Sequence, residues 1–112
     1  MSIIDSISKE YWLIDITPDF RHQLNLIQSH VHTKSQIEGI FITHAHVGHY
    51  LGLLELGLEV INSHETSVYV MPEMKSFLKN NAPFSQLIEL NNIKLHLIEN
   101  DMPLKLNEKL SI

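Results

Sequence analysis

Short apolar runs suited to β-strands alternate with amphipathic segments along most of this chain, and this alternation constrains its fold more than any other feature. Runs rich in β-branched and aromatic residues predict strands at residues 11–16, 37–43 and 66–72, with a further strand at 3–8. Each of the three clear strands is followed by a segment whose apolar residues recur at helical spacing. Strands that alternate with crossover helices build an α/β layer. The sequence therefore predicts an α/β fold.

The segments between the strands predict three helices. Thr17 is expected to cap the first helix, with Pro18 as its first residue, and this helix is expected to run through Gln28. Residues 50–61 are so rich in leucine that we expect a helix covered on most of its circumference. Pro72 is expected to open the third helix.

The alternation of predicted strands and helices ends after residue 85. Residues 87–99 predict two strands about a turn at Asn91 and Asn92, and residues 103–112 predict further β structure. The last residues resemble the beginning of a strand and then stop. A chain of 112 residues suggests one domain. We therefore expect residues 1–112 to be a single domain, the truncated N-terminal part of a larger one.

Composition narrows the classes of function. Thirteen acidic and eight basic residues give a net charge of −5, and the basic residues are scattered, so nucleic-acid binding is not indicated. Cysteine is absent, which excludes disulfides and thiolate ligands. The N-terminus lacks the pattern of a secretory signal, and no segment is uniformly apolar over a membrane-spanning length. We expect a cytoplasmic protein with no membrane partner.

Three histidines follow the predicted strand at residues 37–43 within six positions. His44 and His46 share one side of an extended chain, and His49 lies one helical turn beyond, so all three can converge on one point. Imidazole is a common ligand of zinc, and a catalytic zinc site typically has three protein ligands and one open position. His30 and His32 repeat the H-x-H spacing of His44 and His46, but no predicted strand precedes them, so they are weaker candidates for the site. The other histidines are expected to be solvated polar residues.

The segment THAHVGHYLGL, residues 43–53, resembles the H-x-H-x-D-H signature of the metallo-β-lactamase fold superfamily. The upstream segment LIDITPDFRHQL is similar to the corresponding segment in the branch containing ribonuclease Z, phosphonate-pathway cyclic phosphodiesterases and the pyrroloquinoline quinone biosynthesis protein B group. The resemblance implies half of a metallo-β-lactamase-like αββα sandwich, with a mixed sheet and flanking helices. It also implies a zinc cofactor, one or two ions in the complete domain, with iron as the alternative.

The resemblance also assigns roles to residues. His44 and His46 match ligands of the first metal site of the family, and His49 matches a ligand of the second. Gly48 stands where the family has an aspartate ligand, so an oxygen donor is missing from the second site. Asp15 is expected to accept a hydrogen bond from a ligand histidine and to hold its tautomer.

Two residues near the first helix are weaker candidates for a role in the site. Asp19 is as well explained as a partner of the helix dipole, and Arg21 as a solvated residue or one paired with an aspartate.

The activity implied is that of a metal-dependent hydrolase, in which a metal-bound water cleaves a phosphodiester or ester bond of a small-molecule substrate. Because Gly48 replaces the aspartate ligand, this activity is expected to be incomplete or impaired in the present chain. One alternative is a non-hydrolytic metal-binding biosynthesis protein similar to pyrroloquinoline quinone biosynthesis protein B, and another is a structural remnant. An unfinished sheet would have open edges, so a homo-oligomer is a further expectation.

Overall fold

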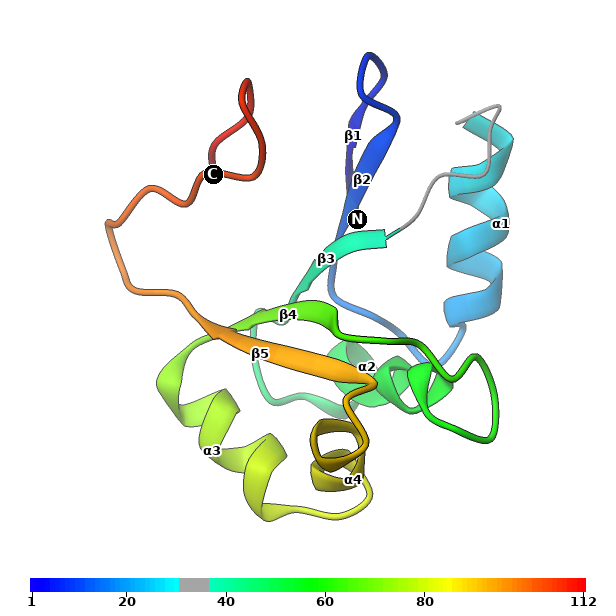
Figure 1. Cartoon of the computed structure of the whole chain (residues 1–112), viewed down its shortest axis with the longest axis vertical. Helices are drawn as coiled ribbons and strands as arrows, with labels where there is room; N and C mark the ends of the chain where they lie inside the picture. The colour runs from blue at the N-terminus through cyan, green and yellow to red at the C-terminus, as the bar shows by residue number, and fades with distance from the viewer. Residues whose placement is uncertain (31–36) are drawn as a thin grey trace.

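A single mixed β-sheet organises the structure, a computed structural model that describes residues 1–30 and 37–112. The strand order is β1-β2-β3-β4-β5, with β1 antiparallel to β2 and the remaining neighbours parallel (Figure 1). The strands are β1 (Ser2–Asp5), β2 (Glu10–Ile14), β3 (Ile37–Phe41), β4 (Thr66–Val70) and β5 (Ile93–Leu97). The prediction of an α/β fold with a mixed sheet and flanking helices is confirmed.

Helical segments connect the parallel strands. They are α1 (Phe20–His30), α2 (Val47–Tyr50), the 3₁₀ helix η1 (Leu51–Leu56), α3 (Pro72–Asn80) and α4 (Phe84–Glu89). In Figure 1, α2, α3 and α4 lie on one side of β4 and β5, while α1 stands beside the other end of the sheet. The crossovers between parallel strands thus leave the carboxyl ends of β2 and β3 next to the start of α2.

The hydrophobic core lies between the sheet and the helices. Ile40 of β3 and Val68 of β4 are fully buried and belong to the same cluster as Leu53 of η1 and Leu78 of α3. Burying one such side chain contributes roughly 1.5–3 kcal/mol to folding. Successive side chains of a strand point to opposite faces of the sheet. The face that carries Ile40 and Val68 is therefore the one that the helices cover.

The opposite face of the sheet carries a row of stacked rings. Phe41, Tyr69 and His96 are neighbours in the strand register, and their ring centroids are 4.7 Å and 5.1 Å apart. Gly39 is needed beneath this row, because a Cβ atom there would lie 2.6 Å from Cε2 of Tyr69 and 3.0 Å from Cδ1 of Trp12.

Two of the predicted helices differ from expectation. The first begins at Phe20 rather than Pro18, and the backbone N–H of Thr17 donates to Oε1 of Gln23 instead of Thr17 acting as an N-cap. The helix expected over residues 50–61 ends at Leu56, since Gly57 adopts an extended conformation. The following residues form turns in which leucine, valine and isoleucine side chains are exposed, so the expected covering of this segment is also wrong beyond Leu56.

The C-terminal part contains less β structure than predicted. Residues 87–89 belong to α4, because Phe84 and Leu87 lie one helical turn apart and are both buried. Asn91 has a φ of 55° and turns the chain into β5, so only one strand forms where two were expected. Residues 103–112 contain a single antiparallel bridge, Lys105 to Ser111, instead of strands.

Candidate metal centre

The three clustered histidines lie beside the carboxyl ends of two neighbouring parallel strands. Asp15 directly follows β2, and the segment from Thr43 to His46 follows β3 and leads into α2, which contains His49. The backbone joins these segments, since the N–H of Ile16 donates to the carbonyl of His49 at 2.9 Å. Ligand sites in α/β sheets form at this kind of edge.

The three imidazole rings lie close together. Ring centroids are 4.0 Å apart for His44 and His49, 4.5 Å for His44 and His46, and 6.4 Å for His46 and His49. His44 and His46 are exposed, and the side chain of His49 is 40% exposed. The structure therefore brings the predicted residues into one cluster that solvent reaches.

Asp15 accepts a hydrogen bond from one of these histidines. Nδ1 of His49 lies 2.7 Å from Oδ2 of Asp15, and the backbone N–H of Thr43 donates to Oδ1 at 2.9 Å. Burial of the carboxyl group would raise its pKa, but the hydrogen bonds from Thr43 and His49 and the nearby His49 charge outweigh burial and lower the pKa of Asp15. Asp15 itself has a φ of 62°, which aims its side chain toward the loop after β3.

Thr43 was not predicted to take part in the site. Its hydroxyl lies 2.9 Å and 3.0 Å from the two carboxylate oxygens of Asp15, and 2.8 Å from Nδ1 of His44. A threonine at the end of a strand has no sequence signal of such a role, since many strand ends carry a threonine. The contact depends on Asp15, which is 28 residues away in the chain.

The donor chemistry of the cluster suits a zinc ion, although the geometry is incomplete. Nδ1 of His44 and Nδ1 of His49 are both engaged in hydrogen bonds, so Nε2 is the atom that each ring has left for a metal. Among residues 1–30 and 37–112, however, no three acidic or histidine side chains are arranged to hold a metal ion. The cluster therefore fits zinc in the kind of ligand but does not form a complete site by itself.

Gly48 leaves open space where the family pattern has an aspartate. A Cβ atom built on Gly48 would have no heavy atom within 4 Å, and its φ lies outside the left-handed region. Neither crowding nor backbone conformation requires a glycine here.

Three other residues considered from sequence, His30, Asp19 and Arg21, lie outside the cluster. Nδ1–H of His30 donates to the carbonyl of Leu26 at 2.7 Å within α1, and His32 lies outside the described residues. Asp19 is exposed directly before α1, where it remains a candidate partner of the helix dipole. Arg21 is a solvated residue, which was one of the two expectations, and it pairs with Glu55 at 3.3 Å rather than with an aspartate.

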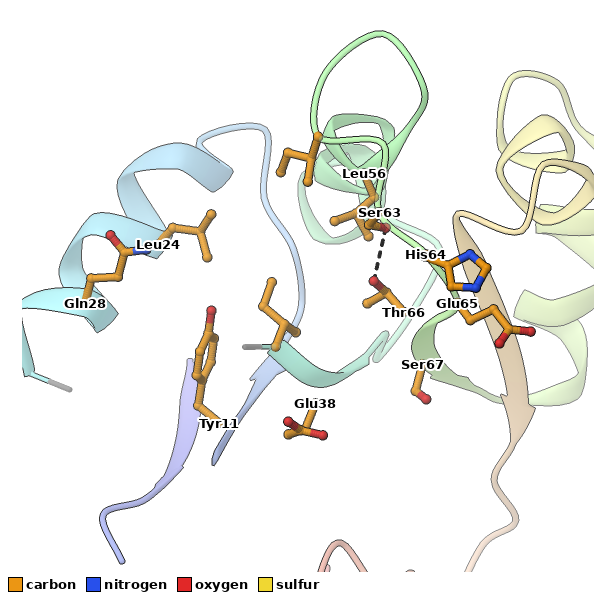
Figure 2. A pocket seen from close by; sticks show the side chains of 12 residues that line it. Tyr11, Leu24, Gln28, Glu38, Leu56, Ser63, His64, Glu65, Thr66 and Ser67 are labelled. Atoms are coloured by element: carbon orange, nitrogen blue, oxygen red, sulfur yellow. Dashed lines mark hydrogen bonds between the residues drawn. The ribbon is translucent and has the colours of Figure 1, made fainter. Parts of the chain in front are cut away.

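A cavity lies at the other end of the parallel strands. It has a volume of about 630 Å³ and is bounded by Leu24 and Gln28 of α1, by the beginnings of β3 and β4, and by residues 63–65 (Figure 2). His64 borders it, but none of the clustered histidines does. The cavity is therefore separate from the candidate metal centre.

Comparison with known proteins identifies the family. The sequence model described as beta-lactamase superfamily domain matches residues 11–112, so this chain belongs to that superfamily. The fold is that of part of a metallo-β-lactamase domain, and the superfamily generally binds zinc. No solved structure matches the chain.

Three similar curated proteins carry the name ribonuclease Z. The one from Prochlorococcus marinus (strain AS9601) is 38% identical over 98 residues, which are 84% of this chain and 30% of the relative. Those from Crocosphaera subtropica (strain ATCC 51142 / BH68) and Rippkaea orientalis (strain PCC 8801 / RF-1) are 37% and 35% identical, over 80% and 78% of this chain and 28% of each relative. The chain thus spans less than a third of the length of these relatives, and family and relatives together indicate a family of metal-dependent hydrolases.

None of the helices in residues 1–30 and 37–112 is long and apolar enough to cross a bilayer.

Proposed function

We propose that this chain carries the first metal-binding segment of a metal-dependent hydrolase, with His44, His46 and His49 as metal ligands. The observation that supports this most directly is the cluster of three imidazole rings at the carboxyl ends of β2 and β3, two of them held through Nδ1. A zinc ion bound there would lower the pKa of a bound water to about 7 and stabilise negative charge on a substrate oxygen.

The residues of this chain would supply binding and orientation. Asp15 would hold the ring of His49 through its Nδ1–H, and the exposed face of the cluster would leave room for a substrate. Because no three described side chains are arranged to hold a metal, we propose that further ligands come from a longer protein, in keeping with the length of the relatives.

The bond proposed to be cleaved is a phosphodiester. The relatives are named as ribonucleases, and RNA is a phosphodiester polymer, so RNA is the first substrate to test. The scattered basic residues and the net charge of −5 favour a small-molecule diester as the alternative substrate.

Gly48 supports a second candidate function. Without a carboxylate at this position, the second metal site lacks an oxygen donor, which favours a protein that binds one metal without hydrolysing a diester. The metal content of the full-length protein separates the candidates: two zinc ions support the hydrolase, one iron supports a non-hydrolytic biosynthesis protein, and no metal supports a structural remnant.

Isothermal titration with zinc tests the proposed ligands. The wild-type chain should bind zinc weakly through its three imidazoles, because further ligands are proposed to come from a longer protein, and a variant with alanine at His44, His46 and His49 should not bind it. A variant with alanine at the exposed histidines His22 and His64 is the matched control and should bind zinc as the wild type does. Equal zinc uptake by the wild type and the triple variant would exclude the cluster as a metal site.

Restoring the missing carboxylate tests the role of Gly48. Gly48→Asp should fold normally, since a Cβ atom there meets nothing within 4 Å, and it should raise zinc uptake and hydrolysis of a model diester. Gly48→Asn has the same shape without the charge and is the control. If neither variant differs from the wild type, the absent aspartate is not what limits the chain.

We also propose that copies of the chain associate through the outer edges of β1 and β5, which are the edge strands of the sheet. Sedimentation of the purified chain should then show dimers or larger assemblies, and a monomer at all concentrations would refute this.

A further inference from the structure

We propose that Thr43 is a positioning residue that holds the ring proton of His44 on Nδ1 and thereby leaves Nε2 free for a metal. This inference deepens the proposed function and rests on His44 being a metal ligand. It concerns where a proton sits in the protein before any metal binds, so it is testable separately.

The argument begins with the donors and acceptors around Thr43. A threonine hydroxyl has one hydrogen to donate and can accept through its oxygen lone pairs. The hydroxyl of Thr43 lies within 3.0 Å of both carboxylate oxygens of Asp15 and 2.8 Å from Nδ1 of His44. Only one of these two neighbours can receive the single hydroxyl hydrogen well.

The carboxylate of Asp15 determines which neighbour receives the hydroxyl hydrogen of Thr43. A carboxylate has no hydrogen to give, and Asp15 already accepts the backbone N–H of Thr43 through Oδ1 and Nδ1–H of His49 through Oδ2. If the hydroxyl of Thr43 pointed at His44, its lone pairs would face the negative oxygens of Asp15 at 2.9 Å, which is repulsive. The hydroxyl therefore donates to Asp15.

The direction of this bond determines the tautomer of His44. With its hydrogen directed to Asp15, the oxygen of Thr43 can only accept from His44, so the imidazole must carry its proton on Nδ1. The same carboxylate receives Nδ1–H of His49 directly. One aspartate thus fixes the tautomers of two histidines, that of His49 by direct contact and that of His44 through Thr43. Both rings keep an unprotonated Nε2.

Long-range ¹H–¹⁵N correlation spectra of the metal-free chain measure this directly. At about pH 8, where an ordinary histidine is neutral, His44 and His49 should both show protonated Nδ1 and unprotonated Nε2. His22 and His64, which are exposed, are the controls in the same spectra and should not share this pattern. Single His→Gln substitutions assign the signals.

Substitutions at Thr43 separate positioning from general support of the loop. Thr43→Val keeps the shape but loses the hydroxyl, so the proton of His44 should move mostly to Nε2 while His49 keeps its wild-type pattern. Thr43→Ser should retain the wild-type tautomer of His44. A wild-type His44 with its proton mainly on Nε2, an unchanged His44 in Thr43→Val, or an equal change at His49 would each overturn the inference; the first of these needs no variant.

Zinc titration of the same three proteins tests the consequence for metal binding. Loss of a group that orients a metal ligand typically weakens affinity about 10- to 100-fold, so Thr43→Val should bind zinc that much more weakly and Thr43→Ser should not. Absence of zinc binding by the wild type, with the expected tautomers, would refute the proposed function alone. If the wild type binds zinc but Thr43→Val leaves the tautomer of His44 unchanged, the positioning role alone is refuted.

Discussion

Gly52 provides the sharpest test of how the candidate metal centre is held together. A Cβ atom at this position would overlap the carbonyl oxygen of Thr17 and would lie 2.7 Å from Cγ1 and 2.8 Å from the carbonyl oxygen of Ile16. Two of these three atoms belong to the backbone, which cannot turn aside as a side chain can. Gly52 also donates its N–H to Ile16 at 3.0 Å, so the two segments are in direct contact.

Gly52→Ala should therefore destabilise the fold substantially. Overpacking a tight core contact typically costs 1–3 kcal/mol, and a clash with backbone belongs at the upper end, about 3 kcal/mol. For a chain of 112 residues this corresponds to a fall in Tm of roughly 10–15 °C. The strain should also separate Asp15 from His49, because the atoms that clash belong to Ile16 and Thr17, one and two residues beyond Asp15, and to Gly52, three residues beyond His49.

Gly48→Ala is the matched control, four residues earlier in the chain. Its Cβ atom meets nothing within 4 Å, and alanine is the better helix former by about 1 kcal/mol or less, so stability should be unchanged or slightly raised. Urea denaturation of the wild type and both variants, followed by circular dichroism, measures the difference. A Gly52→Ala variant within 1 kcal/mol of the wild type, or an equal loss in Gly48→Ala, would refute the packing argument.

Two further predictions concern charged residues away from the cluster. Hydrogen bonds from the N–H of Ile7 and from Asn107 lower the pKa of Asp5 from 3.8 to about 2, so its stabilising contribution should be complete above pH 3.8 and disappear as the pH falls through 2. Urea midpoints between pH 6 and pH 2 should fall less steeply for Asp5→Asn than for the wild type, and parallel curves would contradict this. Arg21→Ala should change stability by less than about 0.5 kcal/mol, because the Arg21 side chain, which pairs with Glu55, is 77% exposed; a loss above 1 kcal/mol would show that this ion pair stabilises the fold.

Patterns within a short stretch of sequence predicted most of the sheet. The strands at residues 11–16, 37–43 and 66–72 were expected from β-branched and aromatic runs, and all three form, with ends that differ by up to two residues. The prediction failed at residues 87–89, where an apolar run without clear periodicity suits a strand and a helix equally. There the buried positions of Phe84 and Leu87 against the rest of the core decide in favour of the helix.

The clustering of the three histidines and a hydrogen bond from one of them to Asp15 were predictable from the sequence, whereas the contacts of Thr43 were not. The spacing of His44, His46 and His49 is a local property, and an extended segment followed by a helical turn is enough to bring the rings together. Thr43 had no such signal, because its role depends on a carboxylate from another strand.

The sequence by itself determined the alternation of strands and helices, the position of the histidine cluster at a strand end and the absence of a carboxylate at residue 48. These depend on side-chain period and residue type, which neighbours in the chain establish. Only the tertiary structure decided that the histidine in contact with Asp15 is His49, 34 residues away, that Asp15 also contacts Thr43, 28 residues away, and that Gly52 must lack a side chain. Such contacts depend on how β2, β3 and α2 pack together, since hydrogen bonds and steric overlap act over a few ångströms whatever the separation along the chain.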